Sequence, residues 1–507
     1  MRIVLNPSIN AKLPTTIVHN RIVNELRKKI KLNSIISAKI DRNSDNHVFL
    51  GRIDNIFPIN SYEGRGTKRE LEIRCSMMLP KLLVRDNIVN SPVLSTNKKI
   101  ANELGDRVQF FTWVRGIKPD GGSVFAGKPE EAVKYILENC VATNSTAITG
   151  AFGKTLTSKT FFNPEKAETL KFTFLTGENL YSPYLSAYSG NLLNYIYQCI
   201  DEHFYEVFFD TETGNDGLAY NTITIRPKPF SWKDYNYTPN AVRGWTYFDD
   251  IQNSAIEKTT EDFALQDTLG ISDYELKNFF TVNFLNSLIA SSNSYLGKFG
   301  LQFPILNIES IKKYGLRELA LTSKLINYDK IRQRYSEEAA EGKISDISEL
   351  LQSEQLAEGG THLDYLLDKR EKGVEWFSFP YFESGNATFI GDENLKIGKG
   401  LFLKDRNYVH PETEEIIKGV YYYINSVNHR WAHGEMFKSS VQLSRGAPKK
   451  VVPDWLNANR SKFISTNAND YTEYMMKTHE DKLLMKEINN SIKEMEEELN
   501  QPIEPLG

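Results

Sequence analysis

The chain has 507 residues and a mass of 58.1 kDa, a length that allows three or four domains of about 150 residues each. Its 61 basic and 65 acidic residues leave a formal net charge of −4, which argues against a dedicated nucleic-acid binder, because such proteins usually carry a basic excess. Charged residues make up 25%, as in ordinary globular proteins, so the composition excludes wholesale disorder. The aromatic share of 12% favours β-strands and large contact surfaces.

The cysteines and the apolar runs restrict the compartment. Cys75, Cys140 and Cys199 are odd in number and far apart, and no two form a CxxC pair, so we interpret them as buried thiols of a reducing cell. The N-terminal stretch lacks the apolar core of a signal peptide, and no run of about 18 apolar residues occurs. We therefore expect a protein made in a cytoplasm and without a membrane segment.

The first 125 residues are predicted to be mostly strand. Short β-rich runs at 35–40, 48–56, 70–75 and 108–114 are separated by polar turns. This pattern is typical of a small barrel or sandwich.

Positive charge gathers at the start of this β-rich region. Residues 1–42 hold nine Lys or Arg against two acids, a local net charge of +7. The cluster is a candidate seat for an acidic neighbour, and a solvated charged face would explain it equally well. Its candidate interface residues are Arg27, Lys28, Lys29 and Lys31.

The pattern changes near residue 126 to alternating helix and strand. Pro129 followed by two acids predicts a helix that runs to about Asn139. Apolar residues at helical spacing predict a second helix over 189–203. Strands at 205–209 and 218–225 then flank a turn rich in Asp, Asn and Gly, so this region is predicted to be an α+β unit.

The remaining half combines strands with a helical stretch. Strands are predicted at 278–282 and 302–308, and helices over about 316–372. From 373 to 446 short β-rich runs return between Gly, Asn and Asp turns.

The tail differs in charge and pattern. Residues 471–507 carry four Lys against nine Asp or Glu, a net charge of −5. Apolar residues at 3-4-3-4 spacing predict an amphipathic helix of about two heptads, which either packs on its own domain or docks another subunit. This seam consists of Met485, Ile488, Ile492, Met495 and Leu499.

Several motifs resemble functional sites without completing them. The sequence 153–155 (Gly-Lys-Thr) lacks the first glycine of a phosphate-binding loop. His429 and His433 lie on a predicted strand, about 13 Å apart along it, too far for one metal ion.

Two acidic groups receive plain structural interpretations. Asp210, Glu212 and Asn215 have the wrong spacing for a calcium loop and are assigned to a solvated hairpin turn. Glu202, His203 and Glu206 are assigned to helix capping and surface ion pairs. No nucleophile motif occurs, so we expect no enzyme activity, cofactor or metal, and a structural or assembly role.

Seven stretches, in this order and spacing, resemble one family. They are FLGRIDNIFPI (49–59), SGNLLNYIYQCIDEHFYEVFFDT (189–211), TITIRPKPF (222–230), SDYELKNFFTV (272–282), KYGLRELAL (313–321), YYYINSVNHRW (421–431) and SVQLSRG (440–446). The family is that of the baseplate hub proteins of phage tails and contractile injection machines, including late-control tail proteins and the hub half of type VI spike proteins.

The resemblance implies a mainly β fold with α+β insertions: two β-barrel domains like the subunit of a tail tube, an α/β domain and a C-terminal helix. The domains expected from it are 1–125 (first barrel), 126–245 (α+β), 246–446 (second barrel, with the helical insertion at about 316–372) and 447–507 (C-terminal extension).

The resemblance also implies a function. Such hubs are ring-shaped homotrimers in the virion baseplate that close the tail tube and adapt its sixfold symmetry to a threefold spike. Their partners are the tube protein, the spike and other baseplate proteins. Two alternatives stay open: a tail-associated protein of a non-contractile tail, and a tail-associated cell-wall hydrolase.

Overall fold

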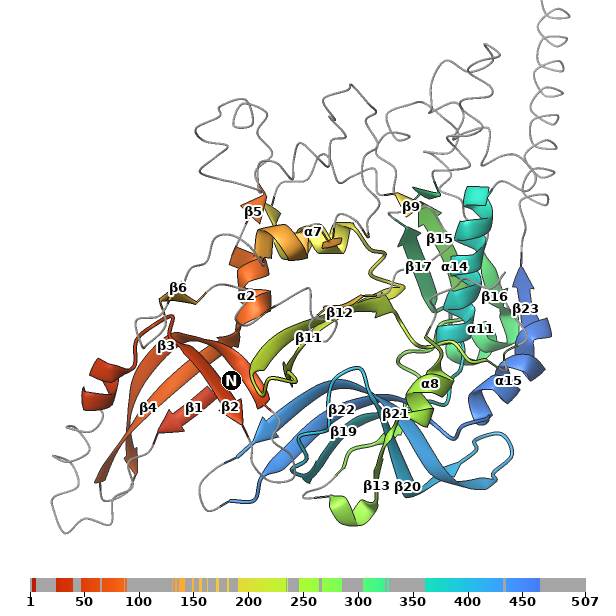
Figure 1. Ribbon diagram of the computed structural model, residues 1–507. Coiled ribbons are helices and arrows are strands. Elements are labelled where there is room, and N and C mark those ends of the chain that lie inside the picture. The colour runs from red at the N-terminus through yellow and green to blue at the C-terminus, as the bar shows by residue number, and fades with distance from the viewer. Residues whose placement is uncertain are drawn as a thin grey trace, which may run out of the picture. The chain divides into compact units, whose positions relative to one another are not determined.

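A computed structural model describes the chain as two units, each compact in its own contacts (Figure 1). The first unit comprises Met1–Leu276, Thr322–Tyr328 and Glu375–Ala458, and the second comprises Lys277–Leu321, Asp329–Val374 and Asn459–Gly507. The residues described are 2–5, 24–39, 47–63, 66–85, 87–88, 130, 133–134, 136–141, 148–149, 155–156, 162, 170–172, 180–181, 190–233, 235, 246–263, 267–284, 304–323, 326–327, 361–431 and 435–465. The fourfold domain division stays a prediction.

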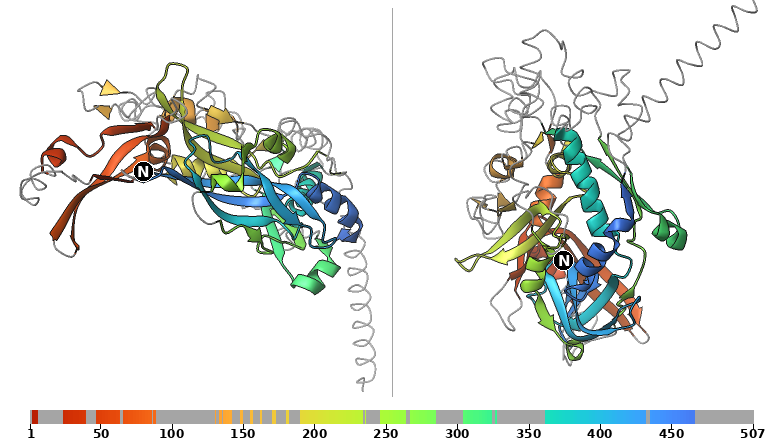
Figure 2. Two further views of the ribbon diagram at one scale, coloured as in Figure 1. Left: turned by 90° about the horizontal axis from the view of Figure 1, so that it is seen from below. Right: turned by 90° about the vertical axis from the view of Figure 1, so that its right-hand side faces the viewer.

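The N-terminal sheet is antiparallel and has the strand order β1-β4-β3-β2. Its strands are β1 (Arg2–Leu5), β2 (Ile35–Lys39), β3 (His47–Glu63) and β4 (Gly66–Met77). Alternate residues of β4, Leu71, Ile73 and Cys75, are buried on one face together with Ile53. The far half of the β3–β4 hairpin extends beyond the residues that β1 and β2 flank (Figure 2).

A three-stranded sheet contains the predicted hairpin. Its strands are β8 (Leu170–Phe172), β11 (Tyr205–Thr213) and β12 (Ala219–Pro227), in the order β11-β12-β8. β11 and β12 are antiparallel, as the turn between two alternating runs predicts, whereas β8 joins β12 in parallel. The helix before the hairpin, α7 (Leu192–Gln198), is shorter than the predicted 189–203 and is capped by Asn191, whose side chain accepts from Asn194 N at 2.8 Å.

A six-stranded sheet forms the other large part of the first unit (Figure 1, mainly blue). In order its strands are β13 (Ile256–Lys258), β20 (Gly400–Val409), β21 (Ile416–Arg430), β22 (Lys438–Ala447), β19 (Glu383–Ile390) and β14 (Gly270–Ile271). Leu403, Val420 and Phe389 are buried on it without measurable exposure. Within the described residues both large sheets are open, so a mainly β fold is confirmed, and the two closed barrels stay a prediction.

An aromatic cluster with a buried cation lies beside the six-stranded sheet. Arg445 has a positive φ of 56°, and its guanidinium carbon lies 3.6 Å from the centroid of the Phe230 ring. Its Nη1 donates to the carbonyl oxygen of Trp376 at 2.7 Å. Burial lowers the pKa of Arg445 to about 10, so the group is still a cation at neutral pH.

The second unit contains a four-stranded sheet of order β17-β15-β16-β23 and two helices. These elements are β15 (Phe279–Phe284), β16 (Ile305–Asn307), β17 (Glu318–Ser323), β23 (Phe463–Ser465), α11 (Ile308–Tyr314) and most of α14 (Thr361–Phe377). Gly373 of α14 allows close packing, because a Cβ there would lie 3.1 Å from a methyl of Leu321.

Residues 318–323 were predicted as helix and form β17. Leu, Glu and Ala favour helices, but Leu319 and the buried Leu321 also alternate with the exposed Glu318 and Ala320. The strand is set by its neighbour, because the carbonyl of Arg317 accepts from Asn278 N at 3.0 Å. Tertiary pairing thus overrides the local preference, whereas the predicted helix is found in α14.

Shorter elements complete the described chain. They are α2 (Met78–Arg85), β5 (Asn87–Ile88), a π-helix (Ile136–Val141), β6 (Ile148–Thr149), β7 (Thr155–Leu156), β9 (Leu180–Tyr181), β10 (Gly190–Asn191), α8 (Phe248–Asn253), a 3₁₀-helix (Thr260–Asp262), β18 (Ile326–Asn327), α15 (Val451–Asn459) and a 3₁₀-helix (Arg460–Lys462). Among the described helices none is long and apolar enough to cross a bilayer. The predicted strand 108–114 lies outside the described residues.

One buried amide joins three elements of the first unit. The Asn221 side chain, on β12, accepts from Leu79 N at 2.9 Å and donates to Leu50 O at 3.0 Å. The N–H of Leu50 in turn donates to Thr211 Oγ1 at 3.1 Å. Asn221 has no measurable exposure. Its side chain supplies hydrogen bonds that water cannot make here to backbone groups at the start of α2 and in β3.

Asn221→Ala should lower the free energy of unfolding by roughly 2–4 kcal/mol, because it leaves a buried N–H and a buried carbonyl unpaired. Scanning calorimetry should show this as a lower midpoint of the first unit's transition. The matched control is Asn428→Ala, at an exposed position of β21, which should stay within about 0.5 kcal/mol of the parent. Equal melting of the two variants would contradict the assigned role.

Candidate functional site

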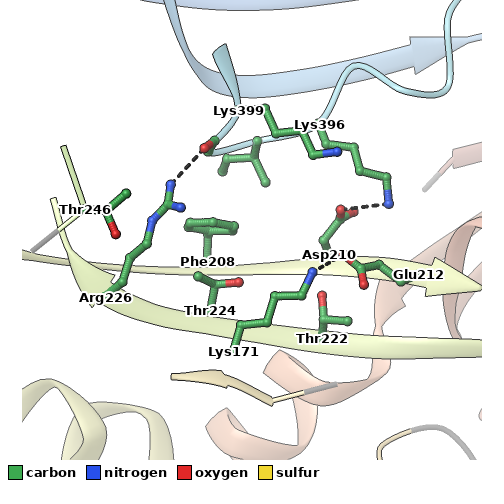
Figure 3. Close-up of a pocket in the computed structure, with 12 residues that line it drawn as sticks. Lys171, Phe208, Asp210, Glu212, Thr222, Thr224, Arg226, Thr246, Lys396 and Lys399 are labelled. Carbon is green, nitrogen blue, oxygen red and sulfur yellow. Dashed lines mark hydrogen bonds and ion pairs between the residues drawn. The ribbon is translucent and has the colours of Figure 1, made fainter. Parts of the chain in front are cut away.

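One face of the β11–β12 hairpin is mostly polar, apart from the aromatic residues Phe208 and Tyr220. Because side chains on a strand alternate between faces, every second residue of each strand lies on the same side. The register pairs Phe208 with Thr224 and Asp210 with Thr222. Segment 396–399, just before β20, lies opposite this face (Figure 3).

A half-buried ion pair within the hairpin is hydrogen-bonded to the six-stranded sheet and to the segment before it. Arg226 Nε donates to Glu206 Oε1 at 2.6 Å, and the hydroxyl of Tyr423 donates to Glu206 Oε2 at 2.6 Å. Arg226 Nη2 also donates to the carbonyl oxygen of Gly398 at 2.8 Å. The side chains of Arg226 and Glu206 are only 18% and 14% exposed, so water screens the pair weakly. We call Glu206, Arg226 and Tyr423 the junction triad.

Burial and charge act together on the ionisation of this triad. Burial raises the pKa of the Tyr423 phenol, and the negative charge of Glu206 raises it further, so the hydroxyl stays protonated and donates. For Arg226, burial is the largest single influence and disfavours the cation, but the charges and hydrogen bonds of Glu206 and Tyr423 together outweigh it and raise the pKa. The guanidinium of Arg226 and the neutral phenol of Tyr423 therefore both donate to Glu206.

Gly398 is required at the turn opposite the hairpin. Its φ is +77°, a left-handed value that favours glycine. A Cβ there would lie 2.5 Å from Cζ of Phe208, so a larger residue would also displace the ring. Segment 396–399 can approach the sheet this closely only because the position has no side chain.

A pocket of about 250 Å³ lies between the polar face and segment 396–399 (Figure 3). Lys396 Nζ lies 3.1 Å from a carboxylate oxygen of Asp210 and donates to the carbonyl of Thr211 at 3.0 Å. Lys171 forms an ion pair with Glu212. The lining residues are Lys171, Phe208, Asp210, Glu212, Thr222, Thr224, Arg226, Thr246 and Lys396 to Lys399.

A second ion pair anchors the segment that leads into the pocket. Lys258 Nζ lies 2.7 Å from Asp392 Oδ2. Burial alone would raise the pKa of Asp392, but hydrogen bonds from Lys258 and Asn394 outweigh it and hold the pKa below the ordinary 3.8. The N–H of Asp392 donates to Ser439 Oγ at 3.0 Å, so this loop is tied to β22 as well.

The structure places two of the motifs that the sequence singled out as possible metal sites, the histidine pair and the acidic group of the hairpin. His429 Nδ1 lies 2.8 Å from Ser439 Oγ across the β21–β22 pair, and burial lowers its pKa; its sequence partner His433 lies outside the described residues. Asp210, Glu212 and Asn215 were assigned to a solvated turn. Asn215 is exposed in that turn, but the structure corrects the assignment of Asp210 and Glu212, because β11 extends through both and lysines pair with them. No group of three His, Cys, Asp or Glu that could hold a metal is found in the described part of the chain.

The predicted basic interface residues are exposed. Arg27, Lys28 and Lys29 lie on the helical segment 24–29, and Lys31 follows it. Leu26 and Ile30 of the same stretch pack against the core of the N-terminal sheet, so the apolar side is covered and the basic side faces solvent. Lys28 Nζ has only an exposed contact of 3.3 Å to Glu25. We call Arg27, Lys28, Lys29 and Lys31 the basic face.

The other predicted interface residues and the cysteines complete this account. The apolar seam at Met485, Ile488, Ile492, Met495 and Leu499 lies outside the described residues, so it stays a prediction. Cys75 and Cys199 are buried thiols, as predicted.

The sequence interpretation missed the junction triad. Glu206 was assigned to the end of a helix, but α7 ends at Gln198 and Glu206 is the second residue of β11. The available signal was the alternation of polar residues in YEVFFDTET and AYNTITIRP, which places Glu206 and Arg226 at the same end of one hairpin face. The third member, Tyr423, could not be paired with them from the sequence, because 217 residues separate it from Glu206.

Comparison with known proteins gives likenesses to solved structures. No family model matches the chain, and no curated protein matches it. The 43 kDa tail protein of prophage MuSo2 from Shewanella oneidensis is similar at 9% sequence identity with a TM-score of 0.35, over 89% of each chain.

Two further similar structures have related names. A tail protein from Neisseria meningitidis MC58 is 9% identical with a TM-score of 0.30, over 80% of this chain and 82% of that one. The prophage tail protein gp18 from Listeria monocytogenes EGD-e is 8% identical with a TM-score of 0.31, over 90% of this chain and 88% of that one.

Asp392→Asn should destabilise the first unit in a pH-dependent way. Because the folded-state pKa of Asp392 is lowered, the stabilisation is complete above its ordinary pKa and is lost as the pH falls through the folded-state value. At pH 7 the variant should lose about 1–3 kcal/mol of unfolding free energy. Thermal melts should show this deficit closing as the pH is lowered towards 3.

The matched control for this pH series is Glu261→Gln, which removes an exposed carboxylate. It should differ little from the parent at every pH. A deficit in Asp392→Asn that stays constant between pH 7 and pH 3 would show that the carboxylate's charge does not cause it.

Proposed function

We propose that this protein is a structural hub subunit of a phage-type tail or contractile injection particle. In this role three copies form a ring that closes the tail tube and adapts its sixfold symmetry to a threefold spike. The protein would act in the baseplate of the virion and contact the tube protein, the spike and other baseplate proteins. Its role would be mechanical and structural, without catalysis of a reaction.

The observation that carries the proposal is where the hub-like stretches meet. Glu206 belongs to stretch 189–211, Arg226 to 222–230 and Tyr423 to 421–431, and these three residues form the junction triad. Residues far apart in the sequence that resemble one family are thus in direct contact. A chance likeness of separate segments has no reason to converge on one half-buried ion pair.

Two further contacts extend this agreement. Arg445, from stretch 440–446, lies over the ring of Phe230, the last residue of 222–230. Leu50, from 49–59, donates its N–H to Thr211, the last residue of 189–211. Five of the seven stretches are therefore joined by direct contacts inside the first unit.

The open sheet edges are a physical reason for copies of the chain to assemble. β2 is an edge strand of the N-terminal sheet, and within the described residues no strand pairs with its outer side. An unpaired edge exposes backbone N–H and C=O groups, and closed cyclic symmetry is a common way to cover such surfaces with copies of the same chain. The seam at residues 485–499 is proposed as a further docking element for another subunit, spike or baseplate protein.

The oligomeric state tests the hub proposal directly. Light scattering of the purified protein should give about 174 kDa, three times the chain mass of 58.1 kDa, if the chain forms a closed threefold ring. Negative-stain images should show rings with a central opening. A monomer or dimer that persists at high concentration would contradict the hub assignment.

The basic face is proposed as the electrostatic seat of an acidic tube subunit. Lys28→Glu with Lys29→Glu should strongly reduce co-sedimentation with assembled tail tubes, because both lysines are exposed and reversal turns attraction into repulsion. Raising the salt from about 50 to about 500 mM should weaken attachment of the parent protein, since screening shortens the reach of these charges.

The chain offers a matched control in a second pair of adjacent lysines. Lys449 and Lys450 are also exposed, so Lys449→Glu with Lys450→Glu makes the same change of net charge elsewhere. This control should attach normally. Equal loss in both double variants would show that only net charge matters, and no loss in the first would remove the basic face from the interface.

A further inference from the structure

The floor of the pocket carries polar groups that the protein itself does not use. Thr222 and Thr224 are only 2% and 7% exposed, and both line the pocket. Within the described residues neither hydroxyl has a hydrogen bond to the protein, and the same holds for Thr246 at the side. Their hydroxyl oxygens are not among the fully buried unpaired atoms of the described residues, so they are reached from the pocket and can donate to and accept from a molecule that enters it.

Three of the four cationic side chains that line the pocket form ion pairs, and one does not. Lys171 pairs with Glu212, Lys396 with Asp210, and Arg226 with Glu206. Lys399 at the mouth is exposed and, within the described part of the chain, its ammonium has no carboxylate partner. The site as a whole therefore has an excess of one positive charge.

All of these groups line the same pocket. Figure 3 shows Lys396 and Lys399 extending from segment 396–399 on one side, with Thr222, Thr224, Phe208 and Lys171 rising from the sheet on the other. The ring of Phe208 supplies an apolar surface at the base. A volume of about 250 Å³ is below the range of roughly 300–1,000 Å³ of pockets for drug-sized ligands, so one ring-sized group fits.

We infer that this pocket binds a sugar acid: one pyranose unit that carries a single carboxylate. The carboxylate would meet Lys399, and the ring hydroxyls would exchange hydrogen bonds with Thr222 and Thr224. The apolar face of the sugar ring would lie on Phe208. This assignment goes beyond the hub function, and binding would stand whether or not the chain belongs to a tail.

Other ligand classes match the groups less well. A neutral sugar uses the hydroxyls but leaves Lys399 without a partner. An acidic peptide side chain uses Lys399 but has no hydroxyls for Thr222 and Thr224. Phosphate brings nearly two negative charges to a site with one to spare, and it has no apolar face for Phe208.

Titration of the whole protein with glucuronate tests the inference. Calorimetry or saturation-transfer NMR should show saturable binding, weakened by added salt because a charge-assisted contact contributes. Glucose, which has the same ring without the carboxylate, should bind at least tenfold more weakly. Cyclohexanecarboxylate, which has one carboxylate on a six-membered ring without hydroxyls, should also bind more weakly than glucuronate.

Three variants locate the binding in this pocket. Lys399→Gln should weaken glucuronate binding roughly fivefold to tenfold and leave glucose binding unchanged, since only the charge contact is lost. Thr224→Val, which keeps the shape and removes the hydroxyl, should weaken both sugars. The control Lys404→Gln removes an exposed lysine of the following strand, β20. This lysine pairs with Glu257 outside the pocket, so the variant should bind like the parent. Melting curves within a degree or two of the parent confirm that the variants fold.

Several results would overturn the assignment. They are no saturable glucuronate binding by the parent, equal affinity for glucose, equal or tighter binding of cyclohexanecarboxylate, or unchanged glucuronate affinity in Lys399→Gln. Glucuronate binding that Lys404→Gln reduces as much as Lys399→Gln would also overturn it, because the effect would then follow overall charge.

Discussion

The hydrogen bonds that link Glu206 and Arg226 of the hairpin to Tyr423 and Gly398 are the constraint on which the arrangement of the first unit depends. A carboxylate with low exposure needs a counter-charge and donors, and here Arg226 and the Tyr423 phenol supply them from β12 and β21. Such a pair adds little net stability, because desolvation offsets the attraction. Its effect is on specificity: another seating of the two sheets would keep the Glu206–Arg226 pair, which lies within one hairpin, but would lose the hydrogen bonds from Tyr423 and to the carbonyl of Gly398.

The pocket follows from that constraint. Arg226 bonds the carbonyl of Gly398, and the absent side chain at Gly398 lets segment 396–399 lie close to Phe208. Lys396 also forms an ion pair with Asp210. Segment 396–399 is therefore bonded to the hairpin at two points, through Gly398 and through Lys396. The cavity is therefore bounded by groups that are already satisfied, while Thr222, Thr224 and Lys399 are left for a ligand.

The sequence predicts local structure well and long-range contacts poorly. A hairpin with strands at 205–209 and 218–225 was predicted, because its alternation and turn lie within about two dozen residues, and the strands are longer in the structure, 205–213 and 219–227. The basic face was singled out from charge alone, and its residues are exposed. Residues 318–323 were predicted as helix, since Leu, Glu and Ala favour one and only the neighbouring strand decides otherwise. Asp210 and Glu212 were placed in solvent because their lysine partners come from distant segments.

The bond between Asn221 and Leu50 has a consequence for how the chain is made. The two residues are 171 positions apart, and ribosomes add about 5–20 residues per second in the synthesis of such chains. For roughly ten to thirty seconds of translation, the nascent β3–β4 hairpin therefore exists without the side chain that completes its contact with the rest of the unit. During that interval its open edges are accessible to other nascent chains, so chaperone demand should concentrate on this early β-sheet.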